Sequence, residues 1–318
     1  MLELALLGCG GGMPIPERYL SAVLMNYRGR KILVDCGEGT QVSMRLLGWG
    51  FKAIDIICIT HIHGDHIVGL PGLLATIGNS GRTEDLMIIG PEGITEAVNG
   101  LRVIAPYLPY NLHIIENPKS TLSFGIDKDG FLLNAPAREL QIGTLSVDHS
   151  SPCLSYSFYI TRRPRFDAVK AMGLNIPKQL WNRLQKGEAL VYEGKSYTPD
   201  MVLGEQRKGI KVSMVTDTRP IEELQGFIRD SDLLICEGTY GTDEDLDKAI
   251  KNKHMTFREA AELAKAGCVE ALLLTHFSPV MQNPEEYGAN AVSVFSNTVI
   301  GTDRLVKSLN FDIEKGEA

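Results

Sequence analysis

The stretch Thr60-His61-Ile62-His63-Gly64-Asp65-His66-Ile67-Val68-Gly69-Leu70-Pro71-Gly72-Leu73-Leu74 decides how this chain is interpreted. Three imidazoles and one carboxylate stand within residues 61–66, directly after the apolar run 54–60. These groups are common ligands of divalent metals, and a loop can direct alternate side chains to two adjacent points. A single histidine in an apolar region would more often be structural. This cluster instead predicts a site for two divalent metal ions.

The same arrangement recurs at three other places, where an apolar run predicted to be a strand ends at a residue that can bind a metal. Loops after strand ends carry function because a rigid sheet holds them in place. The runs and the residues that follow them are 145–147 before Asp148 and His149, 212–216 before Asp217, and 271–275 before His276. We expect these side chains to converge with residues 61–66.

The composition is that of a globular protein, with 318 residues of which 44% are hydrophobic and 22% charged. This length allows one large domain or two small ones. The apolar runs are shorter than the roughly 18 residues of a membrane span, and the N-terminus lacks the basic segment of a signal peptide. The six scattered cysteines predict buried free thiols in a reducing cytoplasm.

Turn and strand signals dominate the first part of the chain. Residues 22–27 and 31–34 flank an Arg28-Gly29 turn, which predicts a β-hairpin. From residue 54 onward, short apolar runs alternate with helical stretches such as 67–78. We therefore expect strands covered by helices, in an α/β or α+β fold.

The charge is uneven along the chain. A net charge of −7 argues against a protein that covers its whole surface with nucleic acid. Residues 161–212 nevertheless carry eleven basic and five acidic side chains, a local net charge of +6. Prolines and a weak core pattern in 161–211 predict an inserted, protruding arm with a short helix around 176–186. From composition alone, a solvated surface is a more common explanation than a site for a polyanion.

Two histidines lie outside the strand-end positions, and their surroundings predict different roles. His113 stands in an alternating apolar run and is interpreted as structural. His254 comes two residues before Thr256, which with Glu259 predicts a capping box at the start of a helix ending at Gly267. An exposed histidine held there suits proton transfer, because its ordinary pKa lies near neutrality. A role in helix entry fits the sequence equally well.

Short motifs spread over nearly the whole chain resemble those of one enzyme family. They lie at residues 7–14 (LGCGGGMP), 34–41 (VDCGEGTQ), 60–74, 148–149, 216–220 (TDTRP), 236–240 (CEGTY), 254–256 (HMT) and 274–278 (LTHFS). The chain resembles metallo-β-lactamase-fold hydrolases, and within them it is similar to the ribonuclease Z family, endonucleases that trim the 3′ end of precursor tRNA. The resemblance implies a single αββα four-layer sandwich over residues 1–318, with the arm inserted at 161–211.

The resemblance also implies a role for each residue of the site. Two Zn²⁺ ions per chain are expected, although Mn²⁺ or Fe²⁺ suits the same ligands. The implied ligands are His61, His63 and His149 for one ion, Asp65, His66 and His276 for the other, and Asp217 for both, with Asp35 supporting the metal loop. A hydroxide shared by the ions would attack the phosphodiester and leave a 3′-hydroxyl on the tRNA. Asp65 would orient or deprotonate it, and His254, oriented by Glu237, would protonate the leaving oxygen.

In the family the arm grips tRNA, so the resemblance assigns RNA binding to the basic segment. The candidate residues are Arg162, Arg163, Arg165, Lys178, Arg183 and Lys186. Precursor tRNA and a second copy of the chain are the implied partners, whereas DNA and a membrane are not expected. Residues 175–181 lack the Gly-Pro motif usual in the arm, and residues 14–19 and 236–239 also depart from the family pattern. None of these departures removes a metal ligand.

Two other functions stay open on the sequence. One is a phosphodiesterase or other hydrolase of small substrates, in which the insertion acts as a lid. The other is a non-catalytic protein that binds metal and RNA. Neutralising the basic residues of the arm distinguishes a hydrolase of small substrates from an endoribonuclease, because only the cleavage of RNA would then be weakened. Cleavage of a phosphodiester by the intact protein would exclude the non-catalytic binding protein.

Overall fold

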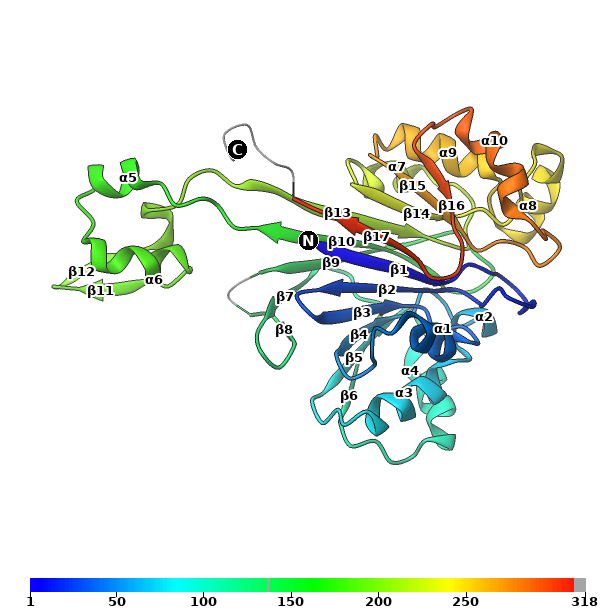
Figure 1. Ribbon diagram of the computed structural model, residues 1–318, viewed down its shortest axis with the longest axis horizontal. Coiled ribbons are helices and arrows are strands. Elements are labelled where there is room, and N and C mark those ends of the chain that lie inside the picture. Colours follow the sequence, from blue (N-terminus) through cyan, green and yellow to red (C-terminus); the bar gives the residue numbers. More distant parts are fainter. Residues whose placement is uncertain (136–137, 312–318) are drawn as a thin grey trace.

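Two β-sheets packed face to face form the body of the protein in the computed structural model, which describes residues 1–135 and 138–311 (Figure 1). The first sheet has seven strands in the order β17-β1-β2-β3-β4-β5-β6. Its strands are β1 (Leu2–Gly8), β2 (Ala22–Tyr27), β3 (Arg30–Val34), β4 (Ile54–Cys58), β5 (Leu86–Gly90), β6 (Leu112–Glu116) and β17 (Leu305–Leu309). The predicted hairpin at residues 22–34 is confirmed.

The second sheet has eight strands in the order β16-β15-β14-β13-β10-β9-β7-β8. Its strands are β7 (Leu122–Ile126), β8 (Phe131–Leu133), β9 (Leu140–Ser146), β10 (Leu154–Arg162), β13 (Arg207–Val215), β14 (Leu233–Glu237), β15 (Leu272–Thr275) and β16 (Thr298–Ile300). In each sheet a block of neighbouring strands runs parallel, β3 to β6 in one and β13 to β16 in the other. The loops after these parallel strands therefore leave each sheet at a single edge.

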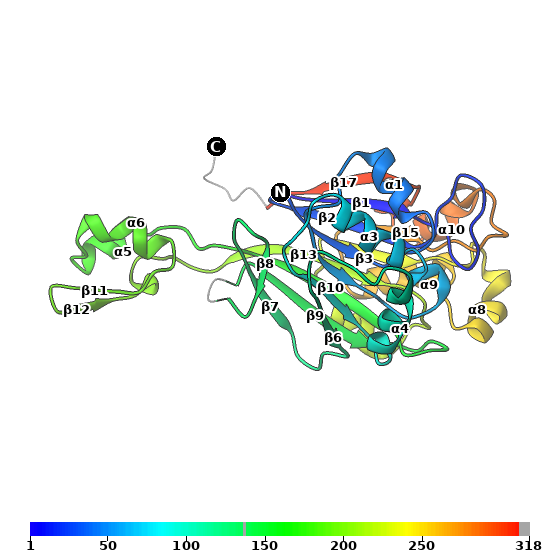
Figure 2. The same cartoon turned by 90° about the horizontal axis from the view of Figure 1, so that it is seen from below.

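Helices cover the outer face of each sheet (Figures 1 and 2). Beside the first sheet lie α1 (Thr40–Leu47), α2 (Gly64–Ile67), α3 (Leu70–Asn79), α4 (Ile94–Leu101) and the 3₁₀ turn η1 (Arg102–Ile104). Beside the second lie α7 (Glu222–Ile228), η4 (Asp243–Asp245), α8 (Leu246–Asn252), α9 (Phe257–Ala266), η5 (Pro284–Tyr287) and α10 (Gly288–Val292). The layers are helix, sheet, sheet and helix, so the expected αββα sandwich is confirmed.

Strand β1 shows how the sequence fills two cores at once. Leu4 and Leu6 belong to the core cluster that includes the facing residues of both sheets, whereas Ala5 and Leu7 pack with the helices of the first sheet. Successive side chains of a strand point to opposite faces, so a strand buried on both sides must be apolar throughout. The run LELALLG meets this requirement at all but Glu3, which bonds Asn26.

The inserted arm leaves the second sheet later, and returns earlier, than the sequence predicted. Strand β10 extends to Arg162 and β13 begins at Arg207, so the protruding segment is 163–206 instead of 161–211. Strands β10 and β13 remain paired as far as Arg162 and Arg207. This pairing lets their backbone groups form hydrogen bonds within the sheet. Both views show this arm standing away from the body (Figures 1 and 2).

The head of the arm has a small core of its own. Its elements are α5 (Ala168–Gly173), η2 (Lys178–Leu180), α6 (Trp181–Gln185), β11 (Leu190–Tyr192), β12 (Lys195–Tyr197) and η3 (Pro199–Met201). Ala171, Ile176, Leu180, Leu184 and Val202 are buried together there. The expected helix around 176–186 is divided into η2 and α6. It starts only after Pro177, which cannot donate a backbone hydrogen bond.

The cysteines and the helix lengths can be compared with the composition. Five of the six cysteines are buried free thiols, but Cys268 is exposed, because it lies in the turn that follows α9. Within the described residues no helix is long and apolar enough to cross a membrane.

Candidate metal centre and active site

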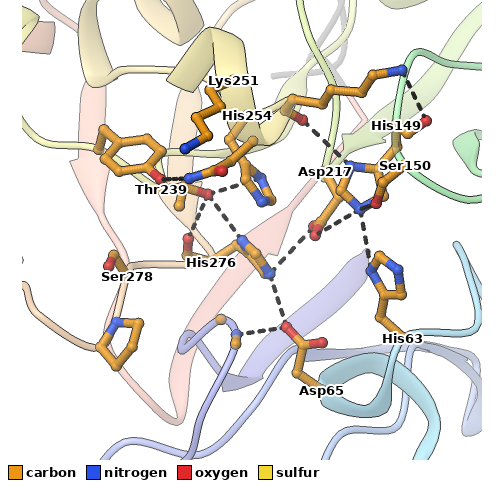
Figure 3. A pocket seen from close by; sticks show the side chains of 16 residues that line it. His63, Asp65, His149, Ser150, Asp217, Thr239, Lys251, His254, His276 and Ser278 are labelled. Atoms are coloured by element: carbon orange, nitrogen blue, oxygen red, sulfur yellow. Dashed lines mark hydrogen bonds and ion pairs between the residues drawn. The ribbon is translucent and has the colours of Figure 1, made fainter. Parts of the chain in front are cut away.

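Loops at the strand ends bring the predicted ligands together. Figure 3 shows His63, Asp65, His149, Asp217 and His276 around one pocket. Residues 61–66 follow β4, His149 follows β9, Asp217 follows β13 and His276 follows β15. Asp217 and His276 have φ values of 50° and 57°, in the left-handed region. Such a residue costs about 1–2 kcal/mol, which the surrounding contacts must offset. The backbone turns sharply at these two points and directs both side chains inward.

The ligand atoms form two clusters. In the first, His63 Nδ1 lies 3.0 Å from His61 Nε2 and 3.2 Å from His149 Nε2. In the second, His276 Nε2 lies 3.1 Å from His66 Nε2 and 3.3 Å from Asp65 Oδ2. The predicted grouping of these six residues is therefore the grouping that the structure contains.

Asp217 stands between the clusters and presents one carboxylate oxygen to each. Its Oδ2 lies 3.6 Å from His61 Nε2 and 3.9 Å from His149 Nε2. Its Oδ1 lies 3.4 Å from His66 Nε2 and 3.3 Å from His276 Nε2. A carboxylate in this position can bridge two cations.

Hydrogen bonds from behind hold the imidazoles in place. His66 Nδ1 lies 2.7 Å from Asp35, which also accepts the Thr60 backbone N–H at 2.7 Å. His276 Nδ1 lies 3.1 Å from the Thr239 hydroxyl. Contacts of this kind set the tautomer and leave the other ring nitrogen for a metal. The expected supporting position of Asp35 is the position seen.

The charge of the centre suits cations. Burial and the neighbouring His66 lower the pKa of His61 to about 2, so this imidazole is neutral, as a metal ligand must be. Burial would also lower the pKa of His66, but Asp217 and Asp35 raise it well above its ordinary value. The buried carboxylates therefore attract positive charge. Imidazole nitrogens and carboxylate oxygens are the donors that divalent transition metals prefer, so the residues fit the metal that the family implies.

His254 and Glu237 form a separate pair beside the metal ligands. Glu237 is fully buried and accepts hydrogen bonds from the backbone of Thr218 at 2.7 Å and of Met255 at 3.1 Å. Its Oε2 lies 3.1 Å from His254 Nδ1. Burial lowers the pKa of His254, but the Glu237 carboxylate raises it, to about 9. The Glu237 carboxylate therefore favours the protonated form of His254.

The expected capping box is confirmed, but the expected exposure of His254 is wrong. Thr256 accepts the Glu259 backbone N–H, and Glu259 accepts that of Thr256, at the start of α9. The His254 side chain is only 15% exposed, because it lies between the rings of His149 and His276, at 5.3 and 5.5 Å. It lines a cavity of about 480 Å³ together with Asp65, Asp217 and His276.

The glycine run at residues 10–12 has a role that the sequence did not reveal. Gly12 donates its backbone N–H to Asp65 Oδ2 at 2.6 Å. A methyl group added at Gly11 would overlap the His276 imidazole. The sequence pointed to this run only as a motif of the family resemblance, whereas the structure shows that its small residues let the backbone approach two metal ligands.

Lys253 is a second residue that the sequence did not single out. Its ammonium lies 2.7 Å from Asp148 Oδ1, and its carbonyl accepts a hydrogen bond from His149 Nδ1 at 3.4 Å. Arg219 donates to the His254 carbonyl and to Glu259. These two cations join the loops that carry His149, Asp217 and His254. The opposite charges that meet here are far apart in the sequence, so no local pattern predicted their contact.

The remaining predicted residues lie elsewhere. His113 pairs with Asp85 on the exposed side of β6, away from the centre. Arg162, Arg163 and Arg165 lie at the base of the arm, and Lys178, Arg183 and Lys186 lie on its head. Arg163 pairs with Glu139 of the body, Arg183 pairs with Glu188, and Lys178 contacts the Trp181 ring. The arm stands at one end of the molecule's longest dimension, and α2, which contains Asp65 and His66, lies on the far side of the body from it (Figure 1).

Comparison with solved structures shows the class of fold. The metallo-β-lactamase fold protein YhfI of Bacillus subtilis matches with a TM-score of 0.67 and 20% identity, over 97% of this chain and 100% of that one. Human tRNase Z, short form, matches with a TM-score of 0.66 and 23% identity over the same shares. The chain therefore has the metallo-β-lactamase fold.

Sequence comparison shows the family. The ribonuclease Z of Clostridium beijerinckii is 64% identical over 98% of this chain and 99% of its own length. The family described as anti-Pycsar protein Apyc1 matches residues 2–98. The chain belongs to the ribonuclease Z family of metal-dependent endoribonucleases. The family and the enzyme class inferred from the motifs are confirmed.

Proposed function

We propose that this chain removes the 3′ trailer from precursor tRNA by a hydrolysis that leaves a 3′-hydroxyl on the tRNA. The observation that carries the proposal is the position of the His254–Glu237 pair beside two ligand clusters that share Asp217. The clusters suit phosphodiester hydrolysis, and the pair suits protonation of a leaving oxygen. The likeness to tRNase Z and to ribonuclease Z relatives supports tRNA as the substrate.

The two clusters would hold two divalent cations, which we propose to be Zn²⁺, with Mn²⁺ or Fe²⁺ suited to the same donors. His61, His63 and His149 would hold one cation, and Asp65, His66 and His276 the other, with one oxygen of Asp217 for each. When bound, such a pair polarises a phosphodiester and supplies a nucleophilic water at neutral pH.

The side chains of the protein orient the reactants and move the proton. Burial would raise the pKa of the Asp65 carboxyl, but His276 and His66 hold it well below its ordinary range. Asp65 therefore orients the attacking water and does not keep its proton. As the bond from phosphorus to the 3′-oxygen breaks, the His254 imidazolium donates its proton to that oxygen. Glu237 keeps the imidazole oriented and charged.

Glu237→Gln should move the alkaline limit of kcat to lower pH. The acid acts when protonated, so activity is present below the pKa of His254 and is lost as pH rises through it. Glu237 raises that pKa to about 9, and glutamine keeps the size of the side chain without its charge. The fall of kcat should therefore begin at lower pH with unchanged metal content. A pH profile measures this, with Glu116→Gln on the surface as control, and an unmoved alkaline limb would contradict the assignment.

We propose that the arm binds the RNA, and that it serves the active site of a second copy. The head carries exposed Lys178, Arg183 and Lys186, which suit a phosphate backbone. The arm points away from the edge that carries its own metal centre (Figure 1). A homodimer would bring the arm of one chain to the centre of the other. We also propose a cytoplasmic location, because free thiols suit a reducing compartment.

Lys178→Gln combined with Arg183→Gln should raise KM for precursor tRNA several-fold and reduce its salt dependence. Each phosphate contact that is lost lowers the slope of log affinity against log salt by about one. Hydrolysis of bis(p-nitrophenyl) phosphate should not change, because this ester does not reach the arm. Equal losses on both substrates would contradict RNA binding by the arm and favour a hydrolase of small substrates. Mapping the 3′ ends that the protein produces from precursor tRNAs with and without an encoded CCA would define the cleavage position.

A further inference from the structure

One wall of the cavity at the metal centre contains none of the residues assigned to the cations. Tyr240, Lys251 and Asn252 line this wall beside His254, and we call these three residues the outer wall. Lys251 and Asn252 are the last two residues of α8, just before His254 in the chain, and Tyr240 follows the end of β14. In Figure 3, Lys251 lies on the side of the pocket that carries His254, whereas Asp65 lies on the other side.

The Tyr240 ring is held in one orientation before any substrate binds. Its backbone N–H donates to the Met255 carbonyl at 3.3 Å, and its own carbonyl accepts the Phe257 N–H at 2.8 Å. At the far end of the side chain, the hydroxyl accepts a hydrogen bond from Asn252 Nδ2 at 2.7 Å. The ring centre lies 6.5 Å from that of His254, with the two planes at 62°. An aromatic ring fixed at both ends loses little conformational entropy when a ligand packs on it.

A place in the hydrophobic core does not account for this ring. Among the described residues, Tyr240 belongs to none of the three apolar clusters, which contain other tyrosines such as Tyr156. Its side chain is only partly buried and lines the cavity instead. A preorganised aromatic surface at a cavity suits a planar ligand, and the planar groups of RNA are its bases.

The direction of the proposed reaction decides which base this is. Hydrolysis breaks the bond from phosphorus to the 3′-oxygen, so that oxygen and its nucleotide leave together as the new 3′ end of the tRNA. His254 must lie within hydrogen-bond distance of this oxygen to protonate it. The last nucleotide of the tRNA therefore lies on the His254 side of the cavity, next to the outer wall. The first nucleotide of the trailer stays attached to phosphorus and extends away from the leaving oxygen.

We propose that Tyr240 stacks on the base of the last nucleotide of the tRNA, and that Lys251 contacts the phosphate on the 5′ side of this nucleotide. This inference rests on the proposed function. Lys253 already pairs with Asp148, whereas Lys251 is exposed, so Lys251 is the cation of this wall that suits a phosphate. Every base has a π-face, so stacking accepts all four bases. The stacked base would set the 3′-oxygen beside His254 without reading the sequence.

The test compares the Kd values of two tRNA transcripts that have no trailer and end at the first unpaired nucleotide after the acceptor stem. In one of them the last nucleotide is an abasic ribose. The unmodified, metal-loaded protein should bind the abasic transcript about ten-fold more weakly, because the missing base cannot stack. Tyr240→Ala should bind both transcripts with this lower affinity, whereas Tyr240→Phe keeps the ring and should keep most of the difference. Equal binding of the two transcripts by the unmodified protein, or an unchanged preference in Tyr240→Ala, would overturn the inference.

Abasic sites in the precursor distinguish the two sides of the cleaved bond. An abasic ribose directly 5′ of the bond should lower kcat/KM of the unmodified protein about ten-fold and should not lower that of Tyr240→Ala further. An abasic ribose directly 3′ of the bond should affect both proteins by the same factor. If its effect disappears in Tyr240→Ala, the ring holds the trailer and the assignment is wrong.

Lys251→Gln tests the contact with phosphate. The slope of log affinity for the transcript with an intact end against log salt should fall by about one. Lys265→Gln, which changes an exposed lysine of α9, is the matched control and should leave the slope nearly unchanged. Equal slopes in Lys251→Gln and in the unmodified protein would overturn this contact.

Tyr107→Ala is the control for the loss of a tyrosine ring, because Tyr107 is exposed and does not line the cavity. It should bind both transcripts as the unmodified protein does, and all variants should keep the metal content of that protein. Binding that depends on the last base, in a protein that cleaves no precursor, would overturn the proposed function and not this subsite. Cleavage and binding that do not depend on the last base would overturn the subsite alone.

Discussion

Asp217→Ala is expected to remove both cations and to reduce RNA cleavage below detection. The two carboxylate oxygens of Asp217 lie 3.3–3.9 Å from imidazoles of both clusters. Without them, each cation would keep only three ligands. The imidazoles would also face each other with no carboxylate between them. Loss of this one side chain should therefore affect both sites, whereas loss of a ligand of one cluster should affect chiefly that cluster.

Metal analysis of the purified and metal-replenished protein measures this result. The unmodified chain should hold two tightly bound ions and Asp217→Ala fewer than one. Asp85→Ala is a matched control, because Asp85 also contacts a histidine, His113, but on an exposed strand outside the centre. It should keep both ions. Two tightly held ions in Asp217→Ala would show that the carboxylate does not bridge.

His254→Ala should lower kcat for precursor tRNA by about 10²–10⁴-fold while both ions remain bound, as is usual when a general acid is lost. His254 is paired with Glu237, and although its ring also lies within 4.8 Å of ligand atoms of His149 and Asp217, the six residues assigned to the two cations and the bridging Asp217 do not include it. The metal sites should therefore survive its removal. The leaving 3′-oxygen, in contrast, would depart without a proton.

The leaving group provides the decisive comparison for His254. The p-nitrophenolate of bis(p-nitrophenyl) phosphate departs without protonation, so its hydrolysis should be nearly insensitive to His254→Ala. His113→Ala serves as the control and should leave both reactions unchanged. If His254→Ala slowed both esters equally, His254 would act on the metal sites or on the fold and not as an acid. If the intact protein bound both ions but cleaved no phosphodiester, a non-catalytic binding function would be favoured.

Local pattern was sufficient for several parts of this molecule. The cluster at residues 61–66 follows β4, and Asp217 and His276 follow β13 and β15, as the apolar runs predicted. A strand end and a helix cap depend on neighbouring residues, which is why the hairpin at 22–34 and the box of Thr256 and Glu259 were also predictable. The assignment of ligands to two clusters came from the family resemblance, and the geometry agrees with it.

The sequence by itself determined the strands, their apolar faces and the chemical nature of the residues at their ends, because these features are written in short periodic patterns. Only the tertiary structure decided which oxygen of Asp217 faces which imidazoles, and that Gly11 leaves room for His276. It alone joined Lys253 to Asp148. Contacts of this kind depend on how two sheets and an arm pack, and residues far apart in the chain leave no local trace of their meeting.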